Sequence, residues 1–252
     1  MNSGLKVLRL ATRTLKLAIT RPARLSHVFG TALAASDEVI CRSTDLLRFR
    51  SVAVEDLLPD AGEVPIVKLA LFPKTHASLS TLEAVCLILL IKKAKAASIF
   101  EFGTYKGVSI TQCALNLPED SRIYTLDLPE QASGVRFAIP DPDERQIALE
   151  PKKGSAVPAA LRPRIQFLKQ DSARFDAQSF AGRMDFVFVD GAHSADYVRN
   201  DSEKGWQMLR PGGIIAWHDC RPADPDVVAY LLQSPFNPIR IGGTSLAFAI
   251  KP

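Results

Sequence analysis

The fold is decided by the stretch Ser98-Ile-Phe-Glu-Phe-Gly-Thr-Tyr-Lys-Gly107. It reads as an apolar strand that ends in the acid Glu101, followed by glycine, three residues and a second glycine. Gly103 permits a tight turn with close backbone approach, and Gly107 lets the next helix pack near the strand with its free N–H groups presented to a ligand. The stretch predicts a loop that holds a nucleotide-like ligand. A strand-to-helix turn that merely contains two glycines is the alternative.

Glu101 distinguishes this loop from a dinucleotide fingerprint. A carboxylate beside a pyrophosphate would be repelled, whereas a carboxylate beside an amino-acid ammonium group is attracted. The spacing also lacks GxGxxG. An NAD-dependent dehydrogenase is therefore disfavoured, and we expect Glu101 to contact the ammonium end of the ligand.

Strand and helix patterns alternate from residue 78 onward. The strands are expected at 98–102, 122–127, 165–169, 184–189, 213–217, 238–241 and 245–250. Alternation of this kind predicts a mostly parallel α/β sheet with right-handed crossovers and helices on both faces. Gly242 and Gly243 separate the last two strands, which predicts a C-terminal antiparallel hairpin.

Further polar residues follow the strands in order. Asp127 ends the second strand, Asp171-Ser172 follows the third, Asp190-Gly-Ala-His193 ends the fourth, and Leu209-Arg-Pro-Gly-Gly213 introduces the fifth. Together with Glu-x-Gly-x-x-x-Gly, this order resembles the class I S-adenosylmethionine-dependent methyltransferases from about residue 78 to the C-terminus. The resemblance implies a Rossmann-like, seven-stranded, mostly parallel sheet. Taken singly, each acid could be a solvated strand end or a helix cap.

The same resemblance implies S-adenosylmethionine as the methyl donor. Asp127 would accept hydrogen bonds from both ribose hydroxyls, and Asp171 would lie beside the adenine. The donor-binding residues expected from it are Glu101, Gly103, Thr104, Tyr105, Gly107, Ser109, Asp127, Leu128, Asp171, Ser172 and Asp190.

A narrower resemblance lies in the segment from Asp190 to Asp196 together with Trp217-His218-Asp219, which is similar to the bacterial subgroup related to macrocin-type sugar O-methyltransferases. In related metal-dependent enzymes, including the catechol type, acids at the ends of the fourth and fifth strands bind magnesium. Asp190 and Asp219 occupy matching positions, and His218 departs from the usual pair. The resemblance implies a divalent cation held by Asp190, Asp219 and His218. Oxygen ligands suit magnesium, whereas an imidazole ligand favours manganese, iron or zinc, so magnesium or manganese is expected.

His193 and Asp190 are the expected catalytic residues. An imidazole at this edge of the sheet can act as a base near neutral pH. A hydrogen-bonded structural imidazole is the alternative for both His193 and His218.

Length and connection lengths suggest the domain organisation. The 252 residues allow one main domain with an extension. We expect an N-terminal helical extension or cap over residues 1–75 and the methyltransferase domain over residues 76–252. The proline-rich stretch 129–163 is too long for an ordinary connection and follows a strand on the ligand-binding edge, so it is expected to be an inserted loop that acts as a lid.

The formal net charge of +4 is concentrated near the N-terminus. Lys6, Arg9, Arg13 and Lys16 form one stripe of a predicted amphipathic helix, opposite an apolar face. This pattern indicates peripheral contact with an anionic membrane or with another copy of the chain, and a helix packed on its own core is the alternative. The charge distribution also argues against a nucleic-acid groove across the domain. A secretory signal is disfavoured, because Arg13 and Lys16 interrupt the apolar region that it requires.

The four cysteines and the apolar runs bear on the compartment. Cys41, Cys86, Cys113 and Cys220 show no CxxC spacing, which favours a reducing compartment without a disulfide framework. The longest apolar run, 84–91, is far below the roughly 18 residues of a membrane span. We expect a cytoplasmic protein that can also lie at the membrane surface.

These observations predict methyl transfer to a hydroxyl of a small molecule, assisted by a metal. Two alternatives from other classes stay open. One is a non-methylating enzyme of the same fold, because the resemblance extends to cephalosporin hydroxylase-type proteins. The other is a protein that binds S-adenosylmethionine without turnover. Segments 20–75 and 129–163 would line the acceptor site, and neither names the acceptor.

Overall fold

The computed structural model describes residues 45–59, 63–72, 79–129, 134–149, 151 and 153–252. Residues 46–252 form one compact unit. The basic stripe from Lys6 to Lys16 lies outside the described residues, so the predicted N-terminal helix stays a prediction.

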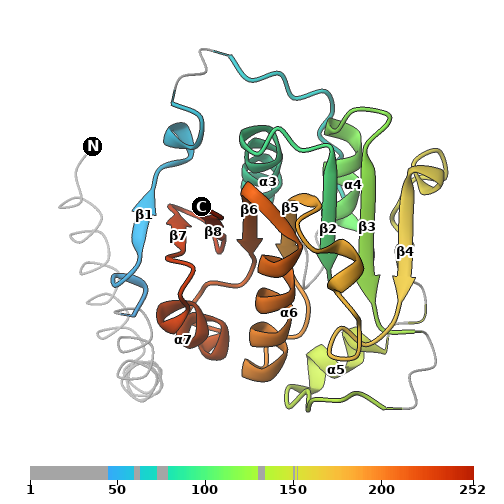
Figure 1. Ribbon diagram of the computed structural model, residues 1–252, viewed down its shortest axis with the longest axis vertical. Helices are drawn as coiled ribbons and strands as arrows, with labels where there is room; N and C mark the ends of the chain where they lie inside the picture. The colour runs from blue at the N-terminus through green and yellow to red at the C-terminus, as the bar shows by residue number, and fades with distance from the viewer. Residues whose placement is uncertain (1–44, 60–62, 73–78, 130–133, 150, 152) are drawn as a thin grey trace, which may run out of the picture. The chain divides into compact units, whose positions relative to one another are not determined.

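An eight-stranded sheet, of order β1-β7-β8-β6-β5-β2-β3-β4, forms the centre of this unit (Figure 1). Among the described strands β8 alone runs against the others, because it pairs antiparallel with both β6 and β7. The strands are β1 (Arg50–Val52), β2 (Ser98–Phe102), β3 (Arg122–Asp127), β4 (Ile165–Lys169), β5 (Met184–Val189), β6 (Leu209–Trp217), β7 (Ile239–Ile241) and β8 (Ala247–Ile250).

The predicted fold class and the C-terminal hairpin are confirmed, but the strand number is eight rather than seven. The additional strand is β1, which pairs in parallel with β7 at the edge of the sheet. It has three residues, two of them exposed, so it carries no alternating apolar pattern that sequence reasoning could detect. The described part of the predicted 1–75 extension therefore contributes a strand to the sheet and belongs to the same compact unit.

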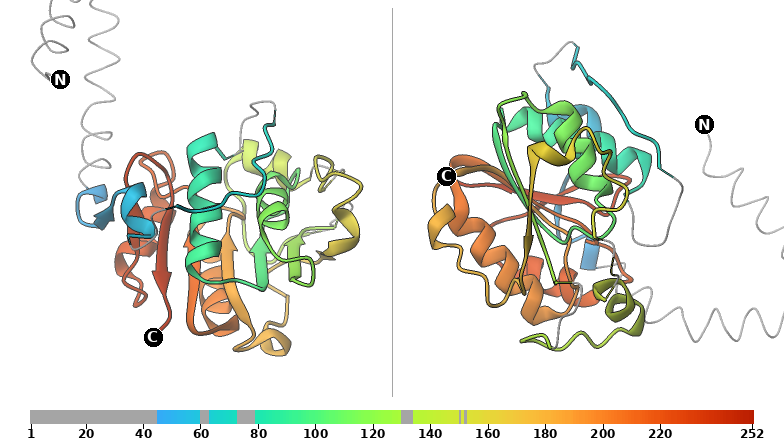
Figure 2. Two further views of the ribbon diagram at one scale, coloured as in Figure 1. Left: turned by 90° about the horizontal axis from the view of Figure 1, so that it is seen from above. Right: turned by 90° about the vertical axis from the view of Figure 1, so that its right-hand side faces the viewer.

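Helices cover both faces of the sheet (Figure 2). Helices α3 and α4 pack on one face, and α6 and α7 pack on the other. The α-helices are α3 (Thr81–Lys93), α4 (Val108–Asn116), α5 (Pro142–Ala148), α6 (Ala195–Met208) and α7 (Pro225–Gln233), and the 3-10 helices are η1 (Val54–Leu57), η2 (Arg162–Arg164) and η3 (Gln178–Phe180).

Strand β5 shows how the strands serve both layers. Phe186 and Phe188 face the α3–α4 core, whereas Val187 and Val189 face the α6–α7 core. A parallel strand that is buried on both faces reads as a continuous apolar run, as this one does. The polar residues that follow such strands therefore collect at one edge of the sheet.

The inserted segment 129–163 has two described parts with different roles. Helix α5 lies beside the carboxyl ends of the strands (Figure 1), where Asp141 caps it by accepting from two backbone N–H groups. The later part packs against the glycine loop, since the Gly154 and Ala156 N–H groups donate to the carbonyls of Tyr105 and Lys106. The insert is thus partly a support for the loop, and its role as a lid stays a prediction.

Candidate active site

A cavity of about 610 Å³ lies at the carboxyl edge of the sheet. Ligand sites of this kind typically enclose 300–1,000 Å³. The predicted donor residues that line it are Gly103, Thr104, Tyr105, Gly107, Ser109, Asp127, Leu128, Asp171, Ser172 and Asp190. His193, His218 and Asp219 line the same cavity. One cavity thus collects the predicted donor loop and the predicted catalytic edge, and Glu101 is the predicted residue that is not part of its wall.

The loop requires glycine at two positions, because each combines a positive φ with a lack of space for a side chain. Gly103 has φ +94°, and a Cβ there would lie 2.0 Å from the carbonyl oxygen of Asp190. Gly107 has φ +83°, and a Cβ there would lie 2.5 Å from the Val157 side chain. Side chains rarely adopt positive φ, and neither neighbour leaves space for one. The loop therefore presses against the end of β5 on one side and against the insert on the other.

Glu101 lies beneath the loop, with 2% of its surface exposed. The hydroxyls of Ser109 and Thr125 donate to its two carboxylate oxygens. Burial raises the pKa of Glu101 to about 8, although these two hydrogen bonds oppose the shift. This position does not support the predicted direct contact with an ammonium group. Ser109 does line the cavity, and its hydroxyl is hydrogen-bonded to this carboxylate.

Asp127 organises the loop from the end of β3. One of its oxygens accepts from the backbone N–H groups of Thr104 and Tyr105, at 3.0 and 2.7 Å. The other accepts from the Leu128 N–H at 2.7 Å and lies 3.2 Å from the Lys153 ammonium. Lys153 comes from the insert, and sequence reasoning missed it because no local pattern links it to β3. These four donors occupy the roughly four lone-pair sites of the carboxylate.

Asp171 lines the cavity and follows β4. Its carboxylate accepts from the backbone N–H groups of Arg136 and Ala173 and from the Tyr197 hydroxyl. A carboxylate with three such donors has a fixed orientation. The structure therefore places Asp171 in the same cavity as Asp127, as the sequence predicts.

Asp201 is a buried acid in this region that sequence reasoning did not single out. It lies on α6 with 2% of its surface exposed and reaches the cavity wall. Burial raises its pKa to about 7, against hydrogen bonds from Ser172 and Asn200 that lower it. No motif marks this residue, because an acid within an amphipathic helix normally faces solvent.

The raised pKa of Asp201 predicts a pH-dependent penalty on folding. The unfolded chain releases the proton near pH 4, whereas the folded chain keeps it to about pH 7, so stability falls as pH rises between these values. Over the two pH units from pH 5 to pH 7, the loss of folding free energy is about 3 kcal/mol. We expect Asp201→Asn to gain up to about 3 kcal/mol relative to the parent chain between pH 5 and pH 8, measured by urea unfolding. The exposed Asp196→Asn is the control, and a gain that is the same at both pH values would contradict the assignment.

Asp190, His218 and Asp219 meet at the ends of β5 and β6. Nδ1 of His218 lies 3.1 Å from Asp190 Oδ1 and 2.9 Å from Asp219 Oδ2. Burial would lower the pKa of His218, but the charge of Asp190 and hydrogen bonds to nearby carboxylates raise it well above its usual value. The three ligand atoms lie within 4.8 Å of one another, so the predicted metal ligands fit a divalent cation in number, chemistry and spacing.

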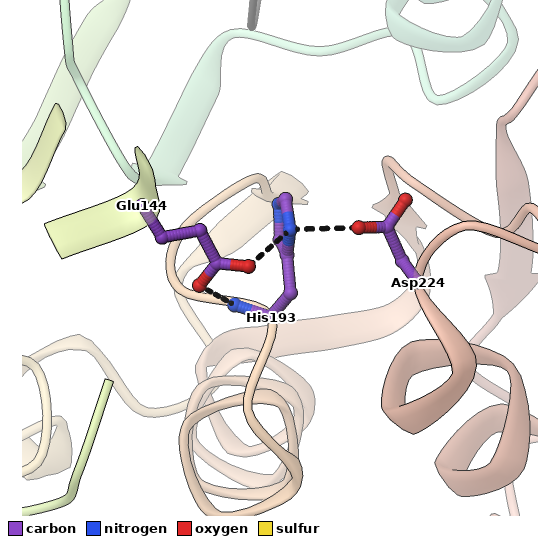
Figure 3. Close-up of side chains that lie close together, drawn as sticks. All are labelled: Glu144, His193 and Asp224. Atoms are coloured by element: carbon purple, nitrogen blue, oxygen red, sulfur yellow. Dashed lines mark hydrogen bonds and ion pairs between the residues drawn. The ribbon is translucent and has the colours of Figure 1, made fainter. Parts of the chain in front are cut away.

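His193 is surrounded by carboxylates (Figure 3). Its Nδ1 lies 2.8 Å from Glu144 Oε1 and 3.0 Å from Asp224 Oδ1, and its Nε2 lies 2.8 Å from Asp219 Oδ2. Burial would lower the pKa of His193, but these three partners raise it to about 12. A ring in this arrangement holds its proton, so the geometry does not support the predicted role as a base near pH 7. Sequence reasoning missed Glu144 and Asp224, which look like surface acids of α5 and of the loop before α7.

Comparison with known proteins bears directly on this site. Residues 100–220 match a family described as a methyltransferase domain. These residues form a methyltransferase domain. The match begins within β2 and includes the glycine loop, Asp127, Asp171, His218 and Asp219. The predicted relation to class I methyltransferases is confirmed, whereas the narrower macrocin-type subgroup stays a prediction.

Curated relatives match about half of this chain. A caffeoyl-CoA O-methyltransferase of Stellaria longipes is 28% identical over 145 residues, which cover 58% of this chain and 55% of the relative. The tapetum-specific methyltransferase 1 of Arabidopsis thaliana is 32% identical over 138 residues, with 54% and 52% covered. The methyltransferase domain therefore corresponds to about half the length of these relatives.

The fold of the methyltransferase domain is shared with a solved structure. The O-methyltransferase TomG from Streptomyces achromogenes, determined in complex with SAM, aligns with a TM-score of 0.50 at 18% identity. The alignment covers 70% of this chain and 82% of that one.

In the part of the chain that the structure describes, no helix is both long and apolar enough to cross a membrane.

Proposed function

We propose that the methyltransferase domain transfers the methyl group of S-adenosylmethionine to a hydroxyl group of a small molecule. The main support for this proposal is that one cavity is lined both by the glycine loop with Asp127 and by the carboxylate–imidazole cluster at Asp190 and Asp219. The relatives and the solved structure described as O-methyltransferases support a hydroxyl as the acceptor.

The donor would be held by the loop and by the acids at the strand ends. Gly103 lets the loop lie close to the end of β5. Gly107, Val108 and Ser109 at the N-terminus of α4 line the same cavity, where free helix N–H groups would meet the ligand. Asp127 would accept from the ribose hydroxyls in exchange for one or more of its present donors, and Asp171 would lie beside the base. Glu101 acts here as a positioning residue, because it fixes the Ser109 hydroxyl from below.

Binding of S-adenosylhomocysteine to the purified chain tests this proposal. We expect calorimetry to detect binding by the parent chain and an affinity lower by roughly 10- to 150-fold in Asp127→Asn, the cost of one charged hydrogen bond. The exposed Asp120→Asn, in the turn before β3, should bind normally. Failure of the folded parent chain to bind at all would refute the function.

The acceptor side would use the cluster at the ends of β5 and β6. Asp190, His218 and Asp219 would hold a divalent cation, and such a cation orients a hydroxyl and lowers its pKa. Helix α5 and the residues before it would help to exclude water, since Ile139 and Ile147 line the same cavity. What the residues must supply is alignment of the acceptor oxygen with the methyl group, together with removal of its proton.

Two other classes of function share these residues. A hydroxylase-like enzyme of the same fold would need an oxidant or an electron donor and would release no S-adenosylhomocysteine. A binding protein would take up the donor without consuming it. Mass spectrometry of an extract incubated with the enzyme and a labelled methyl donor separates the three, because only a methyltransferase moves the label to an acceptor.

We further propose a cytoplasmic protein whose segment 5–19 docks on anionic membranes or on a second copy of the chain. Each Lys or Arg near an anionic surface contributes about 1 kcal/mol. Flotation with anionic liposomes, of the full chain and of a chain that lacks residues 1–24, decides this, and equal flotation would remove the membrane proposal.

A further inference from the structure

His193 is the centre of a second group of ligand atoms, separate from the one at His218. One ligand atom each of Glu144, His193 and Asp224 lies within 4.8 Å of the other two, and the three residues come from α5, from the loop between β5 and α6, and from the N-cap of α7 (Figure 3). Two carboxylates thus converge on one ring nitrogen. A neutral imidazole with carboxylates is a ligand set for manganese, iron or zinc.

The spacing of these atoms suits a metal ion. Ligand atoms that lie about 2.1 Å from a cation and at right angles to one another are about 3 Å apart. The Nδ1 atom of His193 lies 2.8 Å from Glu144 Oε1 and 3.0 Å from Asp224 Oδ1. The other oxygen of each carboxylate is already oriented by the protein: Glu144 Oε2 accepts from the His193 N–H, and Asp224 Oδ2 pairs with Arg221.

The other nitrogen of the ring supplies an independent argument. A metal-binding histidine commonly donates its second ring N–H to a carboxylate, which fixes the tautomer and orients the ring. His193 Nε2 lies 2.8 Å from Asp219 Oδ2. The ring is therefore oriented to present Nδ1 to the space between Glu144 and Asp224.

The net charge also favours bound cations when the groups around His218 and His193 are taken together as one combined cluster. Among the described residues its carboxylates are Glu83, Glu144, Asp190, Asp219 and Asp224, which face one guanidinium, Arg221, and two imidazoles. Even if both imidazoles carry a proton, two negative charges stay uncompensated. Two divalent cations with neutral imidazoles would neutralise the cluster, and buried charges are normally paired or bound to metal.

We propose that Glu144, His193 and Asp224 form a second divalent-cation site, linked to the first through Asp219. The second cation fastens α5 of the insert to the loop after β5 and to the start of α7. This proposal does not depend on methyl transfer, since it concerns metal content alone.

Counting bound Mn²⁺ tests the proposal on the full chain. After treatment with a chelator and equilibrium dialysis against Mn²⁺, we expect two ions per parent chain and one in Glu144→Gln and in Asp224→Asn. Residual affinity at the second site should be weaker by at least about tenfold. Asp143→Asn, an exposed acid on the same helix, should keep both ions, and Asp190→Asn should keep the second one. Electron paramagnetic resonance should show coupling between two Mn²⁺ ions in the parent chain and in Asp143→Asn, but not in the variants that bind one ion.

The opposite results are equally clear. If the parent chain binds no Mn²⁺, or binds one ion that Asp190→Asn removes and Glu144→Gln leaves in place, the second site does not exist and His193 is an imidazolium held by three carboxylates. A single ion that is lost in Glu144→Gln and kept in Asp190→Asn would support the second site and remove the first. Circular dichroism of each variant excludes unfolding as the cause of a lost ion.

Discussion

Replacement of Gly103 by alanine is expected to destabilise the fold by about 2–5 kcal/mol and to abolish binding of the donor. Overpacking typically costs 1–3 kcal/mol, and the left-handed backbone costs a side chain roughly 1–2 kcal/mol more. The added Cβ would lie 2.0 Å from the carbonyl oxygen of Asp190, and backbone atoms cannot rotate away as a side chain could. The loop would have to separate from the end of β5. Urea unfolding and calorimetry with S-adenosylhomocysteine measure the two effects.

Gly182→Ala separates the two causes. Gly182 also has a positive φ, of +66°, but a Cβ there would meet nothing within 4 Å. It should therefore show only the conformational cost, about 1–2 kcal/mol, with unchanged donor affinity. If Gly103→Ala is no worse than Gly182→Ala, the close contact with Asp190 is not a requirement of the loop.

The second large effect is expected at Asp219. Its carboxylate contacts both imidazoles and the Arg221 guanidinium. Asparagine tolerates the left-handed conformation, φ 57°, that this position has, so Asp219→Asn removes charge with little change in the backbone. We expect turnover to fall by roughly 10²- to 10⁴-fold, the range typical of a lost acid–base or metal function, while donor affinity stays within a few-fold. Product formation with a labelled methyl donor measures turnover.

Chelation and two further variants distinguish the mechanisms. Exhaustive chelation should lower turnover as Asp219→Asn does, and added Mn²⁺ or Mg²⁺ should restore it. Activity that survives chelation but falls in His193→Ala would remove the metal and leave a base mechanism, with His193 active despite its carboxylate partners. If Asp190→Asn and His193→Ala both turn over normally with donor binding intact, this cluster is not the catalytic centre.

The sequence predicted both the donor-loop residues and the strand-end residues that line the cavity, but it did not reveal which groups several of them contact. Asp127 and Asp190 follow apolar strands, and the carboxyl ends of parallel strands meet at one edge, so their convergence follows from local pattern alone. Glu101 is different. It is opposite Thr125 in the register of β2 with β3, and that register decides that the side chain meets hydroxyls below the loop rather than the cavity.

Glu144 shows the limit of local pattern most clearly. The segment from Pro142 to Ala148 reads as a short helix capped by Asp141, whose acids belong in its first turn and need no partner. Only the path of the insert brings Glu144 to His193, 49 residues further along the chain. That contact, together with Asp224, sets the protonation of the ring and creates the second cluster.

By itself, the sequence determined the alternation of strands and helices, the glycine loop after β2 and the acids at the strand ends, because periodicity and backbone freedom act between neighbouring residues. The tertiary structure decided the eighth strand, the hydroxyl partners of Glu101, the three carboxylates around His193 and the close approach of Gly103 to Asp190. Each of these joins segments that are distant in the chain. Their energies depend on burial and on charges brought within about 3 Å, and neither quantity exists until the sheet and the insert have packed.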